Sequence, residues 1–214
     1  MEYDIKRASL RDVDFLVEAI MEADKSGSKI SSFTRLFDMT ENEAAKCIKG
    51  VLEEEIDGCE LSISSFLVAY HEGVPVATVA GWKEGSNNNE PSQVIKGNLL
   101  GSHLGIKSLM ALRRNSVVLK DLQVEREIGS YQLEYVYVRS DYRGKGLVQL
   151  LFSEHERLAK DCKNLYILLC ANNTPAISSY RRFGFRDYKI FKSNHPDTLQ
   201  YLPDNTKVLM IKNI

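Results

Sequence analysis

A strand, a helix and a second strand follow one another closely in the second half of the chain. The strand patterns are YQLEYVYV at 131–138 and NLYILLC at 164–170, and the amphipathic run between them extends from Gly146 to about Cys162. A connection of this kind places the two strands parallel to each other in one sheet. The unit therefore predicts a protein of the α/β class.

The first 82 residues predict further strands and helices. The segment IKRASLRDVDFLVEAIMEADK begins as a short strand and continues as a helix, whose apolar positions have helical spacing: Val13, Leu16, Val17, Ile20 and Met21. TENEAAKCIKGVLEEEI predicts a second helix, with Thr40 as its N-cap and Glu43 completing a capping box. In SSFLVAYHEGVPVATVAGW, Gly73 and Pro75 separate two strand patterns, which predicts an antiparallel hairpin.

The rest of the chain divides into an irregular part and a regular C-terminal part. Residues 84–130 combine a loop-like stretch, KEGSNNNEPSQ, with helical stretches that glycines interrupt, so we expect a partly helical insert. NNTPAISSYRRFGF predicts a helix with Thr174 as N-cap, Pro175 in the first turn and a stop at Gly184. FRDYKIF and KVLMIKNI predict two last strands. Because no repeat or linker is visible, we expect one domain over residues 1–214, with a mixed central sheet and flanking helices.

Composition excludes several classes of function. Lys and Arg number 28 against 29 for Asp and Glu, which gives no reason to expect a nucleic-acid or membrane partner. No apolar stretch approaches the roughly 20 residues of a membrane span, and the charged start MEYDIKRASL does not resemble a secretion signal, so we expect a cytoplasmic protein. The cysteines and histidines lack metal-binding spacing, so we expect no metal site; they are Cys47, Cys59, Cys162, Cys170, His71, His103, His155 and His195.

The turn between the first strand and the helix of this unit contains two glycines and two cations. Backbone N–H groups at a helix N-terminus favour an anion, and phosphate is the natural guest. A P-loop requires Ser or Thr after its GK, whereas Lys145 is followed by Gly146 and Leu147. A dinucleotide fingerprint requires a third glycine where the chain has Gln149. An ordinary turn with solvated cations remains the alternative to a phosphate site.

The whole succession LEYVYVRSDYRGKGLVQLLF, NLYILLC and NNTPAISSYRRFGF resembles the core of the GNAT superfamily of acyl-CoA-dependent N-acetyltransferases. The resemblance is good over residues 131–185, weaker over the first 80 and absent from the insert. It implies a GNAT-like domain with a splayed central strand pair and acetyl-CoA as cosubstrate. The family's phosphate motif is R or Q, two residues, G, one residue, then G or A, and Arg143, Gly146 and Val148 occupy those places. Val148 departs from the motif, and we expect its β-branched side chain to crowd the pyrophosphate.

The resemblance also implies roles for individual residues. The exposed backbone of the strand around Val136, Tyr137 and Val138 is expected to bind the pantetheine arm as an added strand would. Asn173 is expected to contact the pantetheine, and Tyr180 to protonate the departing thiolate; the alternative for Tyr180 is a tyrosine that only packs on the sheet. The phosphate-binding turn comprises Arg143, Gly144, Lys145, Gly146, Leu147 and Val148.

A general base is harder to assign. Many relatives place a catalytic glutamate where this chain has Leu168, so that position supplies no base. Alternation along the first strand of the unit puts Glu134 on the same face as Val136 and Val138, which makes Glu134 a candidate. A solvated carboxylate near the start of the strand is the alternative interpretation.

Two functions remain open from the sequence. The first is transfer of an acetyl or short acyl group from acetyl-CoA to a primary amine of a small molecule or peptide, by direct attack of the amine on the thioester. The second is a non-catalytic module that binds acyl-CoA and signals to a partner, which the departures at Val148 and Leu168 favour. The adjacent Arg113 and Arg114 fit either recognition of an anionic acceptor or a solvated helix face. Monomer and homodimer both remain open.

Overall fold

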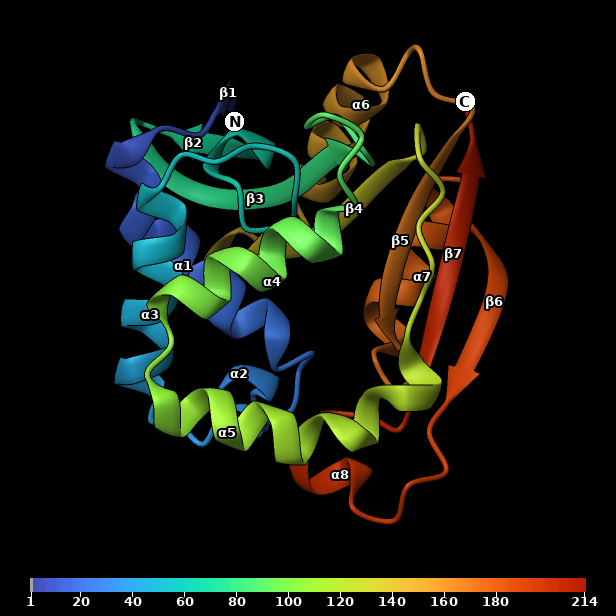
Figure 1. The fold of residues 1–214 in the computed structure, drawn as a ribbon. Coiled ribbons are helices and arrows are strands. Elements are labelled where there is room, and N and C mark those ends of the chain that lie inside the picture. Colours follow the sequence, from blue (N-terminus) through green and yellow to red (C-terminus); the bar gives the residue numbers. More distant parts are fainter. Residues whose placement is uncertain (1) are drawn as a thin grey trace.

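A computed structural model describes residues 2–214 of the chain, and one seven-stranded mixed sheet organises them (Figure 1). The strand order is β1-β2-β3-β4-β5-β7-β6, and every neighbouring pair is antiparallel except β4 and β5. The predicted α/β class and mixed sheet are confirmed. The strands are β1 (Asp4–Arg7), β2 (Phe66–His71), β3 (Val74–Lys83), β4 (Tyr131–Val138), β5 (Asn164–Cys170), β6 (Arg186–Lys192) and β7 (Thr206–Asn213).

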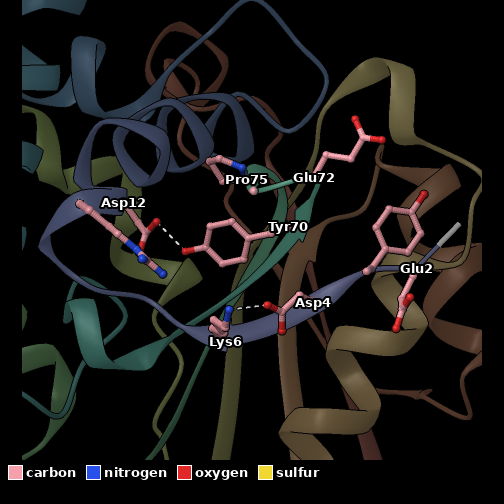
Figure 2. Close-up of a pocket in the computed structure, with 10 residues that line it drawn as sticks. Glu2, Asp4, Lys6, Asp12, Tyr70, Glu72 and Pro75 are labelled. Carbon is pink, nitrogen blue, oxygen red and sulfur yellow. Dashed lines mark hydrogen bonds and ion pairs between the residues drawn. The ribbon is translucent and has the colours of Figure 1, made fainter.

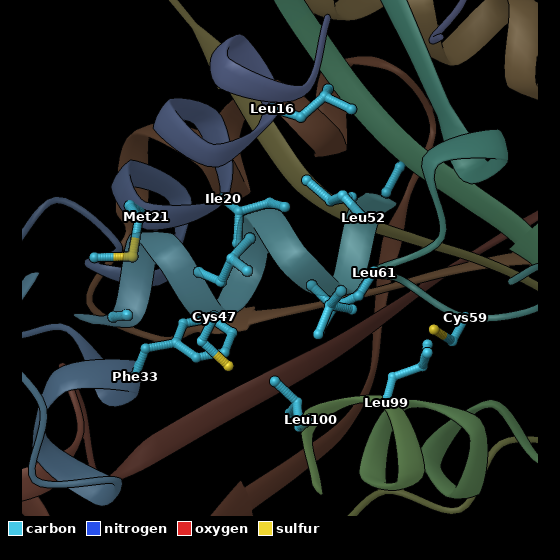
Figure 3. Packing of buried hydrophobic residues seen from close by; sticks show 14 of the residues in the cluster. Leu16, Ile20, Met21, Phe33, Cys47, Leu52, Cys59, Leu61, Leu99 and Leu100 are labelled. Atoms are coloured by element: carbon cyan, nitrogen blue, oxygen red, sulfur yellow. The ribbon is translucent and has the colours of Figure 1, made fainter. Parts of the chain in front are cut away.

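Helices cover both faces of the sheet and bury a separate hydrophobic cluster on each. One face, the α1–α4 face, buries residues such as Leu16, Ile48 and Leu99; Figure 3 shows part of this packing. The other, the α6–α7 face, is centred on Phe152 and Ile177. The helices are α1 (Val13–Asp24), α2 (Ser32–Leu36), α3 (Glu41–Glu53), α4 (Ser92–His103), α5 (Ile106–Asn115), α6 (Leu147–Leu158), α7 (Thr174–Arg182) and α8 (Thr198–Tyr201).

Several local predictions are confirmed. The strands at 131–138 and 164–170 have the expected bounds. The capping box of α3 forms, because Glu43 N donates to Thr40 Oγ1 at 3.2 Å and Thr40 N donates to Glu43 Oε2 at 2.7 Å. Glu72 and Gly73 both have positive φ, as a tight turn between β2 and β3 requires.

Two helix boundaries differ from those predicted. α6 ends at Leu158 rather than near Cys162, because Cys162 N donates to the Ala159 carbonyl oxygen at 2.7 Å in a tighter turn and the chain then turns toward β5. The N-cap of α7 is Asn173 rather than Thr174, since the Asn173 side chain accepts a hydrogen bond from Ala176 N at 3.4 Å. Asparagine is as good an N-cap as threonine, so local sequence did not decide between the two.

The parallel pair at the centre of the sheet separates after a few residues. Pairing runs from Tyr131 opposite Leu165 to Leu133 opposite Ile167 and then stops. β5 continues to Cys170 in contact with β7 alone. The expected splayed strand pair is therefore present, and it leaves one edge of each strand free of its neighbour.

A bulge in β4 accompanies this separation. Tyr135 has a φ of 50°, and the register to β3 shifts so that Glu134 lies opposite Ala80, on the α1–α4 face. Tyr135 packs on the same face, whereas Val136 and Val138 pack on the α6–α7 face. The expectation that Glu134 shares a face with these valines is therefore wrong, because the bulge interrupts the alternation of side chains.

The insert at 84–130 forms α4, α5 and a 3₁₀ segment (Ser116–Leu122) on the α1–α4 face. Figure 1 shows α4 and α5 running across the side of the sheet opposite α7. Their inward side chains, such as Leu99 and Val118, join the hydrophobic cluster of that face. The insert therefore covers the region where β4 and β5 separate.

The four cysteines are buried as free thiols. None of the helices described in residues 2–214 is long and apolar enough to cross a membrane.

A buried histidine ties α6 to the sheet. His155 Nε2 lies 3.0 Å from the Val79 carbonyl oxygen and Nδ1 lies 3.0 Å from the Tyr131 hydroxyl. Gly81 makes room for the ring, since a Cβ there would collide with it. Burial, which disfavours the charged ring, lowers the pKa of His155 to about 4.

We predict that this histidine makes the fold sensitive to mild acid. Its folded pKa lies below the unfolded value of about 6.5, so its contribution is complete above pH 6.5 and is lost as the pH falls toward 4, on the order of 3 kcal/mol in all. His155→Gln lowers stability at pH 7 but should lose about 2 kcal/mol less than the wild type between pH 7 and pH 4.5. Urea unfolding across this range measures the difference, and parallel curves for the two proteins would contradict the assignment.

Candidate active site

The free edges of β4 and β5 open a gap in the sheet that leads into a cavity of about 550 Å³. Its walls include Glu134, Tyr135 and Val136 of β4 and Leu168 and Cys170 of β5. Val136 belongs to the α6–α7 face, whereas Tyr135 belongs to the other face, so the cavity reaches both sides of the sheet at the gap. A ligand that lies between the strands can satisfy the unpaired backbone groups there.

The turn before α6 has the form of an anion site. Gly144 and Gly146 have φ of 73° and 80°, and a Cβ at either position would meet no atom within 4 Å. Gly146 is the N-cap of α6, and no side chain caps the first amides of that helix. These amides, beginning at Leu147, are therefore free to bind an anion in the open space beside the glycines.

The side chains around this turn leave that space open. Arg143 Nε donates to the Val138 carbonyl oxygen at 3.1 Å, which fixes the turn to the end of β4. The Lys145 ammonium lies 4.8 Å from the centre of the Tyr142 ring. Val148 is half-buried and packs into the cluster of the α6–α7 face. Because the Val148 side chain packs in the core, this observation argues against the expected crowding of the pyrophosphate.

Tyr180 packs in the core and also lines the cavity. It is 6% exposed, and its ring centroid lies 5.3 Å from that of Phe152. Its hydroxyl has no hydrogen-bond partner among the residues that the structure describes. Burial raises the pKa of the phenol, which keeps its proton in place at neutral pH. Such a group can donate a proton to a ligand in the cavity.

Asn173 connects the cavity to α1. Besides capping α7, its Nδ2 donates to Ser26 Oγ at 3.3 Å, in the segment that follows α1. Asn173 and Ser26 both line the cavity. The side chain is thus held by its own helix and by the N-terminal part of the chain.

Glu134 is part of a buried network of charges. Its Oε1 accepts a hydrogen bond from Arg126 Nη2 at 2.6 Å, and Arg126 Nη1 lies 3.1 Å from Glu60 Oε2. Lys96 forms an ion pair with Glu60 from the other side. Arg126 also lies over the ring of Trp82, 4.9 Å from its centroid. Opposite charges thus compensate one another inside the protein.

The two carboxyl groups of this network differ in proton affinity. Burial acts to raise the pKa of Glu60, but Arg126 and Lys96 together lower it to about 2. For Glu134, burial raises the pKa and the charge on Glu60 adds to the rise, against the opposing effect of Arg126. Glu60 therefore stays ionised and compensates the cations, while Glu134, whose side chain is 19% exposed, is the carboxyl suited to exchange a proton.

The sequence interpretation missed Glu60, Lys96 and Arg126. A weak signal was present for Glu60, which stands between Cys59 and Leu61 in a run whose neighbours are buried. Nothing comparable marks Lys96 or Arg126 within the insert. The pairing of Arg126 with Glu60 spans 66 residues, and only the fold brings them together.

A second cavity, of about 680 Å³, lies beside the edge strand β1 (Figure 2). The charged and polar groups in it largely pair with one another: Lys6 with Asp4, and the Tyr70 hydroxyl with Asp12 at 2.6 Å. Two strands, β2 and β3, separate β1 from β4 in the sheet order. This cavity contains none of the site residues discussed above, so the smaller one at the strand gap is the candidate active site.

Comparison with known proteins identifies the family of the chain. The sequence model of the Acetyltransferase (GNAT) family matches residues 33–185, and the chain belongs to this family of acetyltransferases, which use acetyl-CoA as cosubstrate. No curated protein sequence matches the chain. Within residues 2–214, no group of three or more His, Cys, Asp or Glu side chains is placed to hold a metal ion.

Solved structures share the fold over nearly the whole chain. One described as an acetyltransferase has a TM-score of 0.66 at 14% identity, with 99% of each chain covered. An N-acetyltransferase from Staphylococcus aureus Mu50 has a TM-score of 0.63 at 15% identity, covering 97% of this chain and 99% of its own. A ribosomal-protein-alanine N-acetyltransferase from Brucella melitensis has a TM-score of 0.55 at 17% identity, with 99% of each covered. At these identities the likeness concerns the fold.

We predict that Gly146→Asp separates folding from cofactor binding. Aspartate is among the residues that tolerate positive φ best, so the backbone strain at Gly146 is modest, while the carboxylate repels the phosphates of acetyl-CoA. Calorimetry should show affinity for acetyl-CoA falling by about tenfold or more, while the urea midpoint falls no more than in a control with the same strain. Gly73→Asp, at the same φ of 80° in the β2–β3 turn, is the matched control and should bind normally. Unchanged affinity in Gly146→Asp would place the phosphates elsewhere.

Proposed function

We propose that the protein transfers an acetyl or short acyl group from acetyl-CoA to a primary amine of a small molecule or peptide, by direct attack of the amine on the thioester. The observation that carries the proposal is that one cavity, at the gap between β4 and β5, is lined by both a carboxyl of raised pKa, Glu134, and a protonated phenol, Tyr180. These are the base and the acid that aminolysis of a thioester requires.

Binding of acetyl-CoA uses backbone groups more than side chains. The phosphates bind at the amides that begin α6, in the space beside Gly144 and Gly146. The pantetheine arm lies in the gap along Val136, Tyr137 and Val138, with Asn173 beside it. This arrangement brings the thioester to the cavity and holds it close to Tyr180.

The chemical step needs two proton transfers. The amine nitrogen attacks the thioester carbon, and Glu134 accepts a proton from that nitrogen, directly or through one water. The negative charge that develops on the carbonyl oxygen is stabilised by a backbone N–H on the free edge of β4. The carbon–sulfur bond then breaks, and Tyr180 donates its proton to the thiolate. The products are the acetylated amine and CoA.

Release of CoA thiol with a panel of amines, together with the mass of the acetylated product, tests this function. Amine-dependent thiol release, with one acetyl group added per thiol, is the expected result. Binding of acetyl-CoA without thiol release in the presence of any amine would instead favour the non-catalytic module.

We predict that Tyr180→Phe reduces turnover while leaving acetyl-CoA affinity nearly unchanged. The substitution removes the proton donor but keeps the ring that packs on Phe152. Because a thiol with a pKa of about 8.5 is already a fair leaving group, kcat should fall by about 100-fold, the low end of the range for a general acid. Pre-steady-state thiol release isolates the chemical step. A loss below about threefold would assign Tyr180 to packing alone.

We predict that Glu134 produces the acid limb of the pH–rate profile. Burial raises its pKa above the usual 4.5, so the base form disappears, and kcat/KM falls, at a higher pH than for an ordinary carboxyl. Glu134→Gln should lower kcat/KM by about 100-fold or more and abolish that limb. The matched variant Glu54→Gln, at an exposed carboxylate on the end of α3, should keep the wild-type profile. An acid limb that persists in Glu134→Gln would assign the base to another group.

A further inference from the structure

The part of the cavity beyond the strand gap is lined by residues that the acetyl-CoA site does not use. They come from α2, from the insert and from the C-terminal segment, and they include Leu36, Leu100, Leu112 and Leu119. Leu112 and Leu119 are only half-buried although they pack on the hydrophobic cluster of the α1–α4 face. The wall therefore offers apolar surface to whatever lies next to Glu134.

Most charged groups in this wall already have partners. Lys96 and Arg126 bind Glu60, and Arg126 also binds Glu134. Asp24 accepts hydrogen bonds at the start of α2, from the Ser31 and Ser32 side chains and a backbone amide. These groups fix the walls of the cavity and have little capacity left for a ligand.

Lys207 is different, because its side chain lines the cavity and makes no hydrogen bond or ion pair to any of residues 2–214; its charge acts on Glu134 only from a longer distance. It is half-buried in β7, where it pairs in register with Cys170 of β5. Paired residues of adjacent strands project on the same face of the sheet, so Lys207 and Cys170 share a face. The next residue, Val208, belongs to the cluster of the α6–α7 face, so Lys207 projects on the opposite face. Helix α6, whose first amides bind the phosphates in the proposed function, packs on the α6–α7 face. Lys207 projects on the other face and therefore takes no part in binding the phosphates.

We infer that the acceptor is a free α-amino acid with a large apolar side chain, whose carboxylate pairs with Lys207. The inference rests on the proposed transfer to an amine. With the amine near Glu134, the side chain lies on the leucine wall, and the half-buried ammonium of Lys207 gains a charge partner. The N-terminus of a peptide fits less well, because it carries no carboxylate next to its amine.

The first experiment compares four acceptors with saturating acetyl-CoA: L-leucine, L-alanine, L-leucinamide and the dipeptide leucylglycine. The kcat/KM for leucine should be higher by about tenfold or more than that for each of the other three. Alanine lacks the large apolar side chain, and leucinamide and leucylglycine lack the carboxylate next to the amine. Preferred turnover of leucinamide or of leucylglycine would overturn the inference while the proposed function stands. If no amine releases thiol, the proposed function fails. The inference is tested separately by binding: if leucine does not bind to the CoA-saturated protein, the inference is overturned as well.

The second experiment changes the cation. Lys207→Met should raise KM for leucine by about tenfold or more and leave both KM for leucinamide and affinity for acetyl-CoA unchanged, while Lys207→Arg should restore most of the binding of leucine. Lys192→Met is the matched control, since Lys192 is exposed on the neighbouring strand β6 and does not line the cavity. An equal effect of Lys207→Met on leucine and leucinamide would show that Lys207 does not recognise the carboxylate.

Discussion

The separation of β4 from β5 is the feature on which the site depends. Three residue pairs hold the strands together, and beyond Leu133 and Ile167 each strand keeps only its outer neighbour. The left-handed residue Tyr135 lies at this point. Such a residue is sterically unfavourable outside glycine, and it is held here by the ladder to β3 on one side and by packing on the α1–α4 face. The backbone groups freed by the separation are what an extended ligand can bind.

A buried pair of opposite charges connects this gap to the rest of the molecule. Arg126 comes from the end of the insert and Glu60 from the segment before β2, and Arg126 pairs with both Glu60 and Glu134. Removing one partner of such a pair typically costs about 3–5 kcal/mol, because the other is left buried without compensation. The network therefore holds the insert over the gap. Burial raises the pKa of Glu134, and within the network the charge on Glu60 adds to that rise while Arg126 and Lys96 oppose it.

The sequence predicted the parts of the fold that depend on local patterns. Thr40 and Glu43 cap α3 as expected, and β4 and β5 have the predicted bounds, because capping and alternation are decided within a few residues. The face of Glu134 was predicted wrongly, since a bulge at a tyrosine leaves no sequence signal. The pairing of Glu60 with Arg126, 66 residues apart, depends on tertiary structure, and so does the place of Lys207 in the cavity. The residues that line the cavity beyond the gap could therefore not be predicted from the sequence.

Amide hydrogen exchange, measured residue by residue with and without acetyl-CoA, tests directly whether the ligand occupies the gap. An extended arm between the strands should slow exchange at free amides of β4 beyond the bulge, and bound phosphates should slow it at the first amides of α6. The β2–β3 turn and the cavity beside β1 should not change. Protection confined to the β1 cavity, with the strand gap and α6 unaffected, would contradict the account of where acetyl-CoA binds and therefore of how the site works.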